Sequence, residues 1–201
     1  MKDRLEKIKL KLKQAADLKI KCFGSGLSDK RSSQFGHKWV SQPVPEDKIV
    51  EFETYYGITL PEEYRAFIKE VGLGAGPYYG LQKLGVGWVC DDETEEGQKN
   101  WLSSPCLLEP IENRKSTDWD EELIKKHNVS EDRVYQGIME IISQGCTYLS
   151  GLIVTGSRRG EVVNLDMDMQ VPRFTDLSFL DWYERWLDKI LERRAEDFRA
   201  N

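Results

Sequence analysis

The chain has 201 residues, of which 39% are hydrophobic and 32% charged, a composition that suits one globular domain with a full core. Its net charge of −6 argues against a nucleic acid partner, because phosphate binding draws on clustered lysine and arginine. The charge is uneven, since residues 1–21 carry +5 and the remainder therefore −11. This imbalance favours a basic protein as the partner of the acidic body, because opposite potentials speed encounter.

The cysteines and the N-terminal residues indicate a compartment. Cys22, Cys90, Cys106 and Cys146 are widely separated, which is typical of isolated thiols in a reducing environment. Residues 1–20 alternate lysine with leucine and isoleucine and lack the uninterrupted apolar stretch of a secretory signal. No window approaches the roughly 18 apolar residues of a membrane span. We therefore expect a cytoplasmic protein.

The first predicted element is an amphipathic helix. Its apolar residues recur at steps of three and four: Leu5, Ile8, Leu12, Ala15 and Leu18. Two interpretations are open: the helix docks on the domain body, or it lies on a membrane surface, for which its apolar face lacks an aromatic anchor. Residues 23–45 are rich in glycine, serine and proline and predict a loop or short hairpin. The sequence thus predicts an appendage over residues 1–43 and a main domain over residues 44–201.

Two helices open the main domain. Residues 46–56 form the first, and Gly57 supplies the left-handed conformation that ends a helix. Pro61 begins the second, where its missing N–H would be unbonded in any case, and Gly72 ends it. A turn-rich stretch with several glycines then leads to a predicted strand over residues 81–90.

The second half of the chain carries the predicted sheet. A short helix over residues 117–126 comes first. Three β-branched and aliphatic runs then predict strands: 139–143, 149–155 and 160–165. Residues 156–160 form a hairpin-like turn, and Ser178 caps a final helix with Asp181 in the capping-box position. Because helices flank strands joined by short turns, we predict an α+β fold with a mainly antiparallel central sheet flanked by helices and an added N-terminal helix.

The sequence contains no recognisable catalytic or metal-binding motif. Residues 72–80 hold several glycines, but they follow a helix and precede a strand, the reverse of the order in a phosphate-binding loop. Asp166 and Asp168 lack a third metal ligand, and neither His37 nor His127 has a partner at zinc spacing. We therefore expect no enzyme activity, no cofactor and no metal.

An acidic stretch with aromatic neighbours is the candidate binding surface. Like charges repel, so residues 91–96 predict an exposed loop or helix start. Aromatic anchors beside charge are a common interface composition, although a solvated charge run near core aromatics would look the same. The predicted contact residues are Trp88, Asp91, Asp92, Glu93, Glu95, Glu96, Trp101 and Trp119.

Several motifs occur in an order that is typical of a known family. In the first half they are Ile49–Glu53, Gly57, Leu60, Pro61, Tyr64, Phe67, Ile68, Gly72, Gly74 and Gly76. In the second half they are Gly145, Cys146, Leu149, Leu152–Val154, Gly156, Gly160–Val162, Ser178, Phe179, Trp182 and Trp186. Over residues 44–191 the chain resembles the SUKH superfamily, which includes the yeast Smi/Knr cell-wall assembly regulators and many bacterial immunity proteins. The N-terminal helix is an addition to that pattern, and residues 162–164 lack the aromatic often found after the Gly-x-Val turn.

The resemblance implies a protein-binding α+β domain without shared catalytic residues. Bacterial members are similar to immunity proteins, which neutralise a cognate toxin, often a nuclease. An acidic protein suits that role, because it can occupy the basic cleft of a nuclease as an anionic mimic. We therefore expect an immunity protein whose partner is a basic protein, with neither nucleic acid nor membrane as partner. Two alternatives stay open: a regulatory or scaffold protein of the yeast cell-wall kind, and an uncharacterised hydrolase that uses acidic residues.

Overall fold

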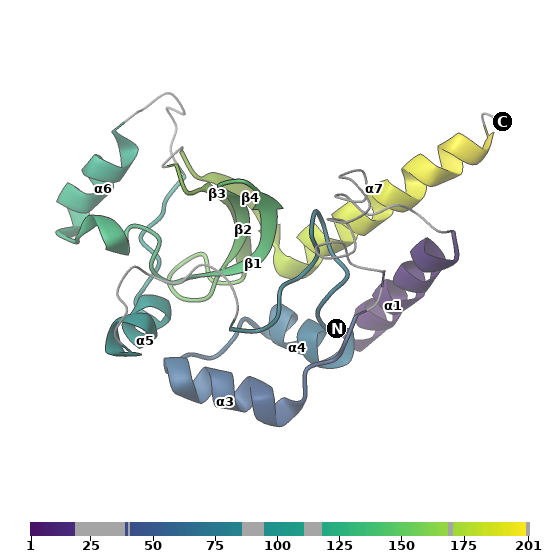
Figure 1. Ribbon diagram of the computed structural model, residues 1–201, viewed down its shortest axis with the longest axis horizontal. Helices are drawn as coiled ribbons and strands as arrows, with labels where there is room; N and C mark the ends of the chain where they lie inside the picture. The colour runs from purple at the N-terminus through teal and green to yellow at the C-terminus, as the bar shows by residue number, and fades with distance from the viewer. Residues whose placement is uncertain (19–38, 40, 86–94, 111–117, 169–170, 200–201) are drawn as a thin grey trace.

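The computed structural model describes residues 1–18, 39, 41–85, 95–110, 118–168 and 171–199 (Figure 1). In chain order its elements are α1 (Lys2–Asp17), α3 (Glu46–Tyr56), α4 (Glu62–Glu70), α5 (Glu95–Ser103), α6 (Trp119–His127), the 3-10 helix η1 (Glu131–Arg133), β1 (Ile138–Gly145), β2 (Tyr148–Ile153), β3 (Glu161–Asp166), β4 (Arg173–Ser178) and α7 (Phe179–Arg199).

The four strands form one antiparallel sheet in the order β1-β2-β3-β4. Its register pairs Ile138 with Ile153 and Leu149 with Leu165. Figure 1 shows the sheet between α5 and α6 on one side and α7 on the other, with α3 and α4 below it. The predicted fold class, a mainly antiparallel sheet flanked by helices with an added N-terminal helix, is confirmed.

Two strand predictions need correction. The predicted strand over residues 81–90 is wrong for residues 81–85, because residues 81–83 form no regular element and residues 84–85 form a turn; the remaining residues lie outside the described ranges. Gly80 and Gly85 both have positive φ values, 88° and 78°, which interrupt an extended run. Strand β4 was not predicted from the sequence, because none of its residues is buried and two of them, Arg173 and Asp176, are charged. Asp176, at φ 54°, also departs from an extended backbone.

Aromatic side chains from α4 and α7 fill the core beside the sheet. Tyr64, Phe67, Phe179 and Tyr183 are fully buried. The rings of Phe67 and Tyr183 lie with centroids 4.6 Å apart, and those of Tyr64 and Phe179 with centroids 4.9 Å apart. Each such pair contributes about 0.5–1.5 kcal/mol beyond its buried area. The Tyr183 hydroxyl donates a hydrogen bond to the Ala75 carbonyl at 2.9 Å, so its one polar group is satisfied.

Helix α1 packs along α7. Four residues of its apolar stripe are buried: Leu5, Ile8, Leu12 and Ala15. Of the two interpretations of this helix, docking on the domain body is therefore the one that the structure shows. None of the helices in the described ranges has the length and hydropathy that crossing a bilayer requires.

Arg4 fastens α1 to two other helices. Its Nε donates to Glu184 Oε2 at 2.6 Å, and Nη2 pairs with Asp181. Its Nη1 lies 3.5 Å from Glu63 of α4, whose other carboxylate oxygen accepts the Leu180 N–H at 3.0 Å. Since that N–H is one of the unpaired donors at the start of α7, Glu63 caps one helix while it anchors another.

Candidate protein-binding surface

The structure buries two of the predicted contact residues. Trp101 and Trp119 each expose only 3% of their surface to solvent. The Trp101 indole N–H donates to the Ile138 carbonyl at 3.4 Å, and the Trp119 ring packs on Tyr135 with centroids 5.9 Å apart. We correct the prediction for these two tryptophans, because a buried ring offers no area to a partner.

The described residues on either side of the gap 86–94 lie near α3. Four predicted contact residues lie outside the described ranges: Trp88, Asp91, Asp92 and Glu93. On the far side of this gap Glu95 begins α5, and Glu96 is exposed in its first turn. On the near side a Cβ built on Gly85 would lie 3.6 Å from the Phe52 ring of α3. Since α5 packs on α3, the end of the acidic stretch that the structure describes belongs to a helix beside α3.

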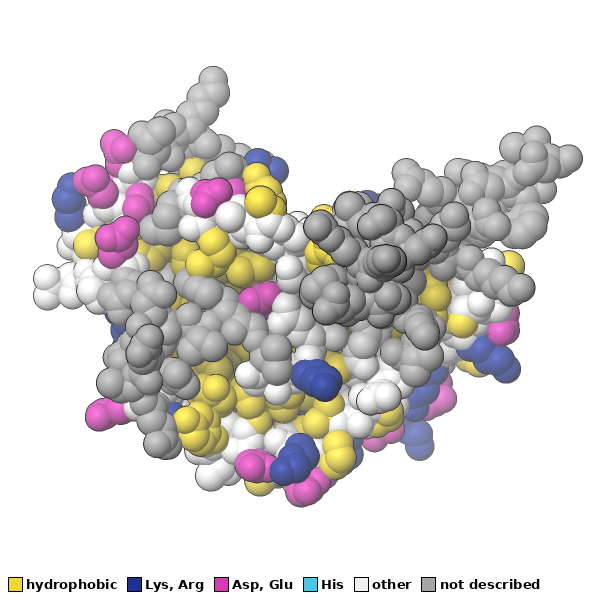
Figure 2. Space-filling model, viewed as in Figure 1, with side chains coloured by type: hydrophobic (Ala, Val, Ile, Leu, Met, Phe, Trp, Pro, Cys, Tyr) yellow, Lys and Arg dark blue, Asp and Glu magenta, His cyan; other side chains and the backbone are white. Residues whose placement is uncertain are grey.

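The outer face of α3 exposes large apolar side chains. Val50 is 46% exposed and Tyr55 is 39% exposed. By helical spacing, the exposed residues Asp47, Glu51 and Thr54 lie between them. Figure 2 shows hydrophobic side chains among charged ones along the lower part of the molecule, where Figure 1 places α3. Exposed apolar side chains beside carboxylates are compatible with a protein interface.

Sequence reasoning missed Val50 and Tyr55, although a signal was present. The helix buries Ile49 and Phe52 along one stripe. A valine and a tyrosine that fall outside such a stripe are apolar residues at polar positions. That departure from the amphipathic pattern marks them as surface candidates.

Neighbouring side chains hold the Tyr55 ring in place. The Tyr56 ring meets it edge-on with centroids 4.8 Å apart, and Tyr56 in turn packs on Phe52 at 4.7 Å. The Lys99 Nζ of α5 lies 4.6 Å from the centroid of Tyr55. A cation over an exposed aromatic ring contributes about 0.5–1 kcal/mol. This contact shows that the environment of Tyr55 already attracts a positive charge.

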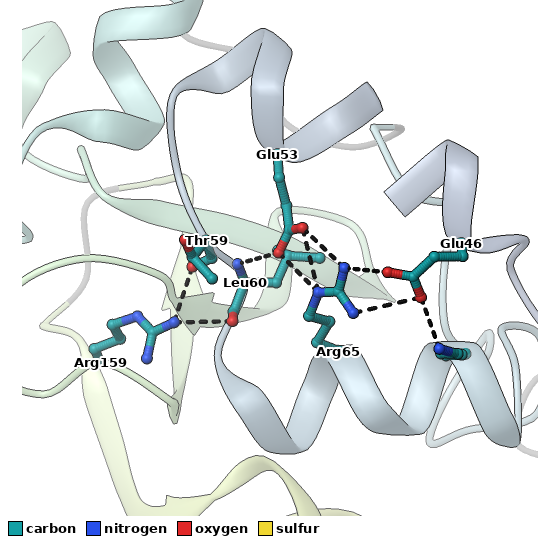
Figure 3. A network of polar contacts seen from close by, with 7 residues as sticks. Glu46, Glu53, Thr59, Leu60, Arg65 and Arg159 are labelled. Atoms are coloured by element: carbon teal, nitrogen blue, oxygen red, sulfur yellow. Dashed lines mark hydrogen bonds and ion pairs between the residues drawn. The ribbon is translucent and has the colours of Figure 1, made fainter. Parts of the chain in front are cut away.

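Ion pairs fix α3 against α4 (Figure 3). Arg65 of α4 donates from Nε to Glu53 Oε1 at 3.1 Å and from Nη2 to Glu46 Oε1 at 2.6 Å. Lys69 adds a second cation to Glu46 at 2.9 Å. Hydrogen bonds from Arg65 and Lys69 lower the pKa of Glu46 to about 2. Ion pairs therefore hold both the first and the last turn of α3, through Glu46 and Glu53, against α4.

The link between α3 and α4 is fixed as well. Glu53 Oε1 accepts the Leu60 N–H at 2.8 Å. Arg159, in the turn between β2 and β3, donates to the carbonyls of Thr59 and Leu60 at 2.9 and 2.8 Å (Figure 3). A surface held in this way loses little conformational entropy when a partner binds.

The two helices that carry this surface are acidic. Helices α3 and α5 together contain six acidic and two basic residues, a formal charge of −4. Glu46 and Glu53 are neutralised by Arg65, whereas Asp47 and Glu96 are exposed. A positively charged protein would be attracted here first.

Helix α6 carries a second acidic run with a different character. Asp118, Glu121 and Glu122 are exposed, and Figure 2 shows acidic side chains gathered where Figure 1 places α6. Lys125 Nζ pairs with Glu121 at 3.1 Å. None of the exposed large hydrophobic residues in the described part of the chain lies on α6. This run is a solvated charged face rather than an interface composition.

The described residues offer no centre for metal chemistry. Among them, no group of three or more histidine, cysteine, aspartate or glutamate residues could hold a metal ion. Asp166 uses one oxygen to accept the Asp168 N–H at 3.0 Å, so the pair forms a turn. Burial raises the pKa of Cys106 to about 11, which keeps its thiol protonated at neutral pH.

A family model matches most of the chain. The model of the SMI1 / KNR4 family (SUKH-1) matches residues 43–185, a region that includes α3, α5, the whole sheet and the first part of α7. Helix α1 lies outside it. No curated protein matches the chain.

Proposed function

Because the chain belongs to the SMI1 / KNR4 family (SUKH-1), as its motifs predicted, we propose that it is a non-enzymatic immunity protein that neutralises a toxin by binding it. The partner is a basic protein, and a nuclease with a cationic substrate cleft fits best. The contact area is the α3–α5 surface, defined as Asp47, Val50, Glu51, Tyr55, Glu96 and Lys99. The observation that carries this proposal is the exposure of Val50 and Tyr55 on a helix surrounded by carboxylates.

The α3–α5 surface has the physical properties of a binding site. Its two apolar residues supply area that stays in contact with water until a partner covers it, and burying a side chain of this size is worth about 1.5–3 kcal/mol. Its carboxylates steer a basic protein toward it and fix the register of the complex. Arg65 and Arg159 hold its supporting elements, so little of the binding energy is spent on ordering them.

The test is rescue of cells from the toxin encoded beside this chain's gene. The α3–α5 charge variant, Asp47→Lys with Glu51→Lys and Glu96→Lys, should abolish rescue, because three like charges would then repel a basic partner. The matched α6 variant, Asp118→Lys with Glu121→Lys and Glu122→Lys, changes the net charge equally and should protect as the wild type does. Circular dichroism melts verify that both variants fold.

Equal protection by the wild type and the α3–α5 charge variant would refute the proposed surface. Loss of rescue in both triple variants would show that net charge, rather than this surface, carries recognition. A protein encoded nearby that is not toxic to cells would count against the immunity role itself.

A regulatory or scaffold role of the yeast cell-wall kind would also rest on protein binding. Self-association through the N-terminal helix would fit that role. In the structure the apolar face of α1 is buried against the chain's own α7. Apart from Met1 just before the helix, Leu10 is its exposed large apolar side chain. The same α3–α5 surface would then serve a regulatory partner, and toxin rescue distinguishes the two roles.

A further inference from the structure

We infer that Tyr55 and Glu51 form a site for an arginine side chain of the partner protein, with the guanidinium on the tyrosine ring and hydrogen-bonded to the carboxylate. The inference rests on the proposed function and names the group that the α3–α5 surface recognises. It starts from two contacts in which lysines of the chain itself occupy these groups.

Both parts of the site already hold a cation. Lys99 Nζ lies 4.6 Å from the centroid of the Tyr55 ring. Lys48 Nζ lies 2.6 Å from Glu51 Oε2. The side chains of Lys48 and Glu51 are 61% and 67% exposed, so their pair is worth little and separates at low cost. Lys99 and Lys48 therefore occupy the two groups, the Tyr55 ring and the Glu51 carboxylate, that one cation of a partner would bind together.

The spacing of the two groups matches one arginine. Glu51 and Tyr55 are four residues apart on α3, so their Cβ atoms lie about 5–6 Å apart on the same face of the helix. A guanidinium is planar, stacks on an aromatic face and donates two parallel hydrogen bonds to a carboxylate. An ammonium group lacks the planar face and the two parallel donors of a guanidinium, so it fulfils both functions less well. The site should thus prefer arginine to lysine.

The Tyr55 ring is positioned for this role before the partner arrives. Its edge-on contact with Tyr56 and the packing of Tyr56 on Phe52 restrict the ring. Val50 lies beyond Glu51 and Thr54 on the same outer face and supplies apolar area for the neighbouring part of the partner. The arginine would thus contact the Tyr55 ring on one side and the Glu51 carboxylate on the other.

A small probe tests the site without the partner. N-acetyl-arginine amide is titrated into the full chain, and the tyrosine ring signals are followed by ¹H–¹³C NMR. N-acetyl-lysine amide and the neutral N-acetyl-citrulline amide serve as comparison probes. We expect the arginine probe to shift Tyr55 with an affinity several-fold above that of the lysine probe, and the citrulline probe to leave Tyr55 unshifted.

Tyr148 is the matched internal control. It is 46% exposed, but its cross-strand neighbour Asp166 is buried, so no accessible carboxylate lies directly opposite. Its ring should not shift with the arginine probe. Equal shifts at Tyr55 and Tyr148, or equal affinities for arginine and lysine probes, would overturn the inference.

Three variants dissect the site. Tyr55→Leu and Glu51→Gln should each weaken binding of the arginine probe about two- to fivefold, the range expected for one exposed cation–π contact or one exposed ion pair. Lys99→Met keeps an unbranched side chain and should tighten binding about two- to threefold, because it removes a competing cation. Weaker arginine binding in Lys99→Met would show that Lys99 supports the site rather than occupying it, and would overturn that step.

The outcome is separable from that of the proposed function. Arginine binding at Tyr55 without toxin rescue would leave the site intact and refute the immunity role. Rescue that depends on the carboxylates but persists in Tyr55→Leu, together with no shift of Tyr55 by the arginine probe, would refute the site and leave the proposed function standing.

Discussion

Helices α1 and α3 are both amphipathic, but they differ in what their outer faces retain. The apolar stripe of α1 is buried against α7, and its outer face is mostly charged around Leu10. Helix α3 buries Ile49 and Phe52 equally well, yet keeps Val50 and Tyr55 in water. Exposed side chains add little to folding, so Val50 and Tyr55 should contribute less to the stability of the fold than Ile49 and Phe52 do.

The largest expected effect separates these two kinds of apolar residue. Ile8→Ala should destabilise the fold by about 2–5 kcal/mol, because the Ile8 side chain of α1 is fully buried. Val50→Ala, at an exposed position, should stay within about 0.5 kcal/mol of the wild type. Urea unfolding of both variants measures the difference. Similar losses of unfolding free energy in the two variants would show that Val50 contributes to folding as much as a buried residue does.

A smaller effect distinguishes the ion pairs of the two helices. Arg4→Met removes hydrogen bonds to Glu184 and Asp181 at a partly buried position and should cost about 1 kcal/mol. The cost should shrink at high salt, since part of it is electrostatic. The exposed pair of Lys48 and Glu51 provides the control, and Lys48→Met should leave the unfolding free energy nearly unchanged. Equal costs would contradict the view that Arg4 anchors α1.

The smallest expected effect is on the acid stability of α3. Hydrogen bonds from Arg65 and Lys69 lower the pKa of Glu46 from 4.5 to about 2 in the folded state. Its contribution to stability is therefore present above pH 4.5 and is lost as the pH falls toward 2. Glu46→Gln should show a shallower loss of melting temperature over that interval. An identical pH profile in wild type and variant would show that this pair does not stabilise α3.

Local signals in the sequence predicted most of the elements. Gly57 ends α3 in the left-handed conformation at φ 63°, as its position indicated. Ser178 accepts the Asp181 N–H at 3.4 Å, half of the predicted capping box. The Asp181 carboxylate, however, pairs with Arg4. A contact between residues so far apart in the chain cannot be deduced from local spacing.

The candidate surface was predicted only in part, for the same reason. The acidic stretch is visible as composition, but whether a tryptophan beside it faces water depends on long-range packing. Trp101 is buried because its indole reaches β1, and Trp119 because it meets Tyr135. Tyr55 could have been selected from its place off the buried stripe of α3. The cation on its ring comes from α5, more than forty residues later in the sequence.

The most direct measurement is amide hydrogen exchange of the chain, alone and mixed with the product of the neighbouring gene, the proposed toxin. The account predicts that the partner slows amide exchange in α3 and α5, where Tyr55 and Glu96 lie, and leaves α6 and the outer face of α1 unchanged. Slower exchange confined to α6 or to α1 and α7, with α3 and α5 unaffected, would contradict it.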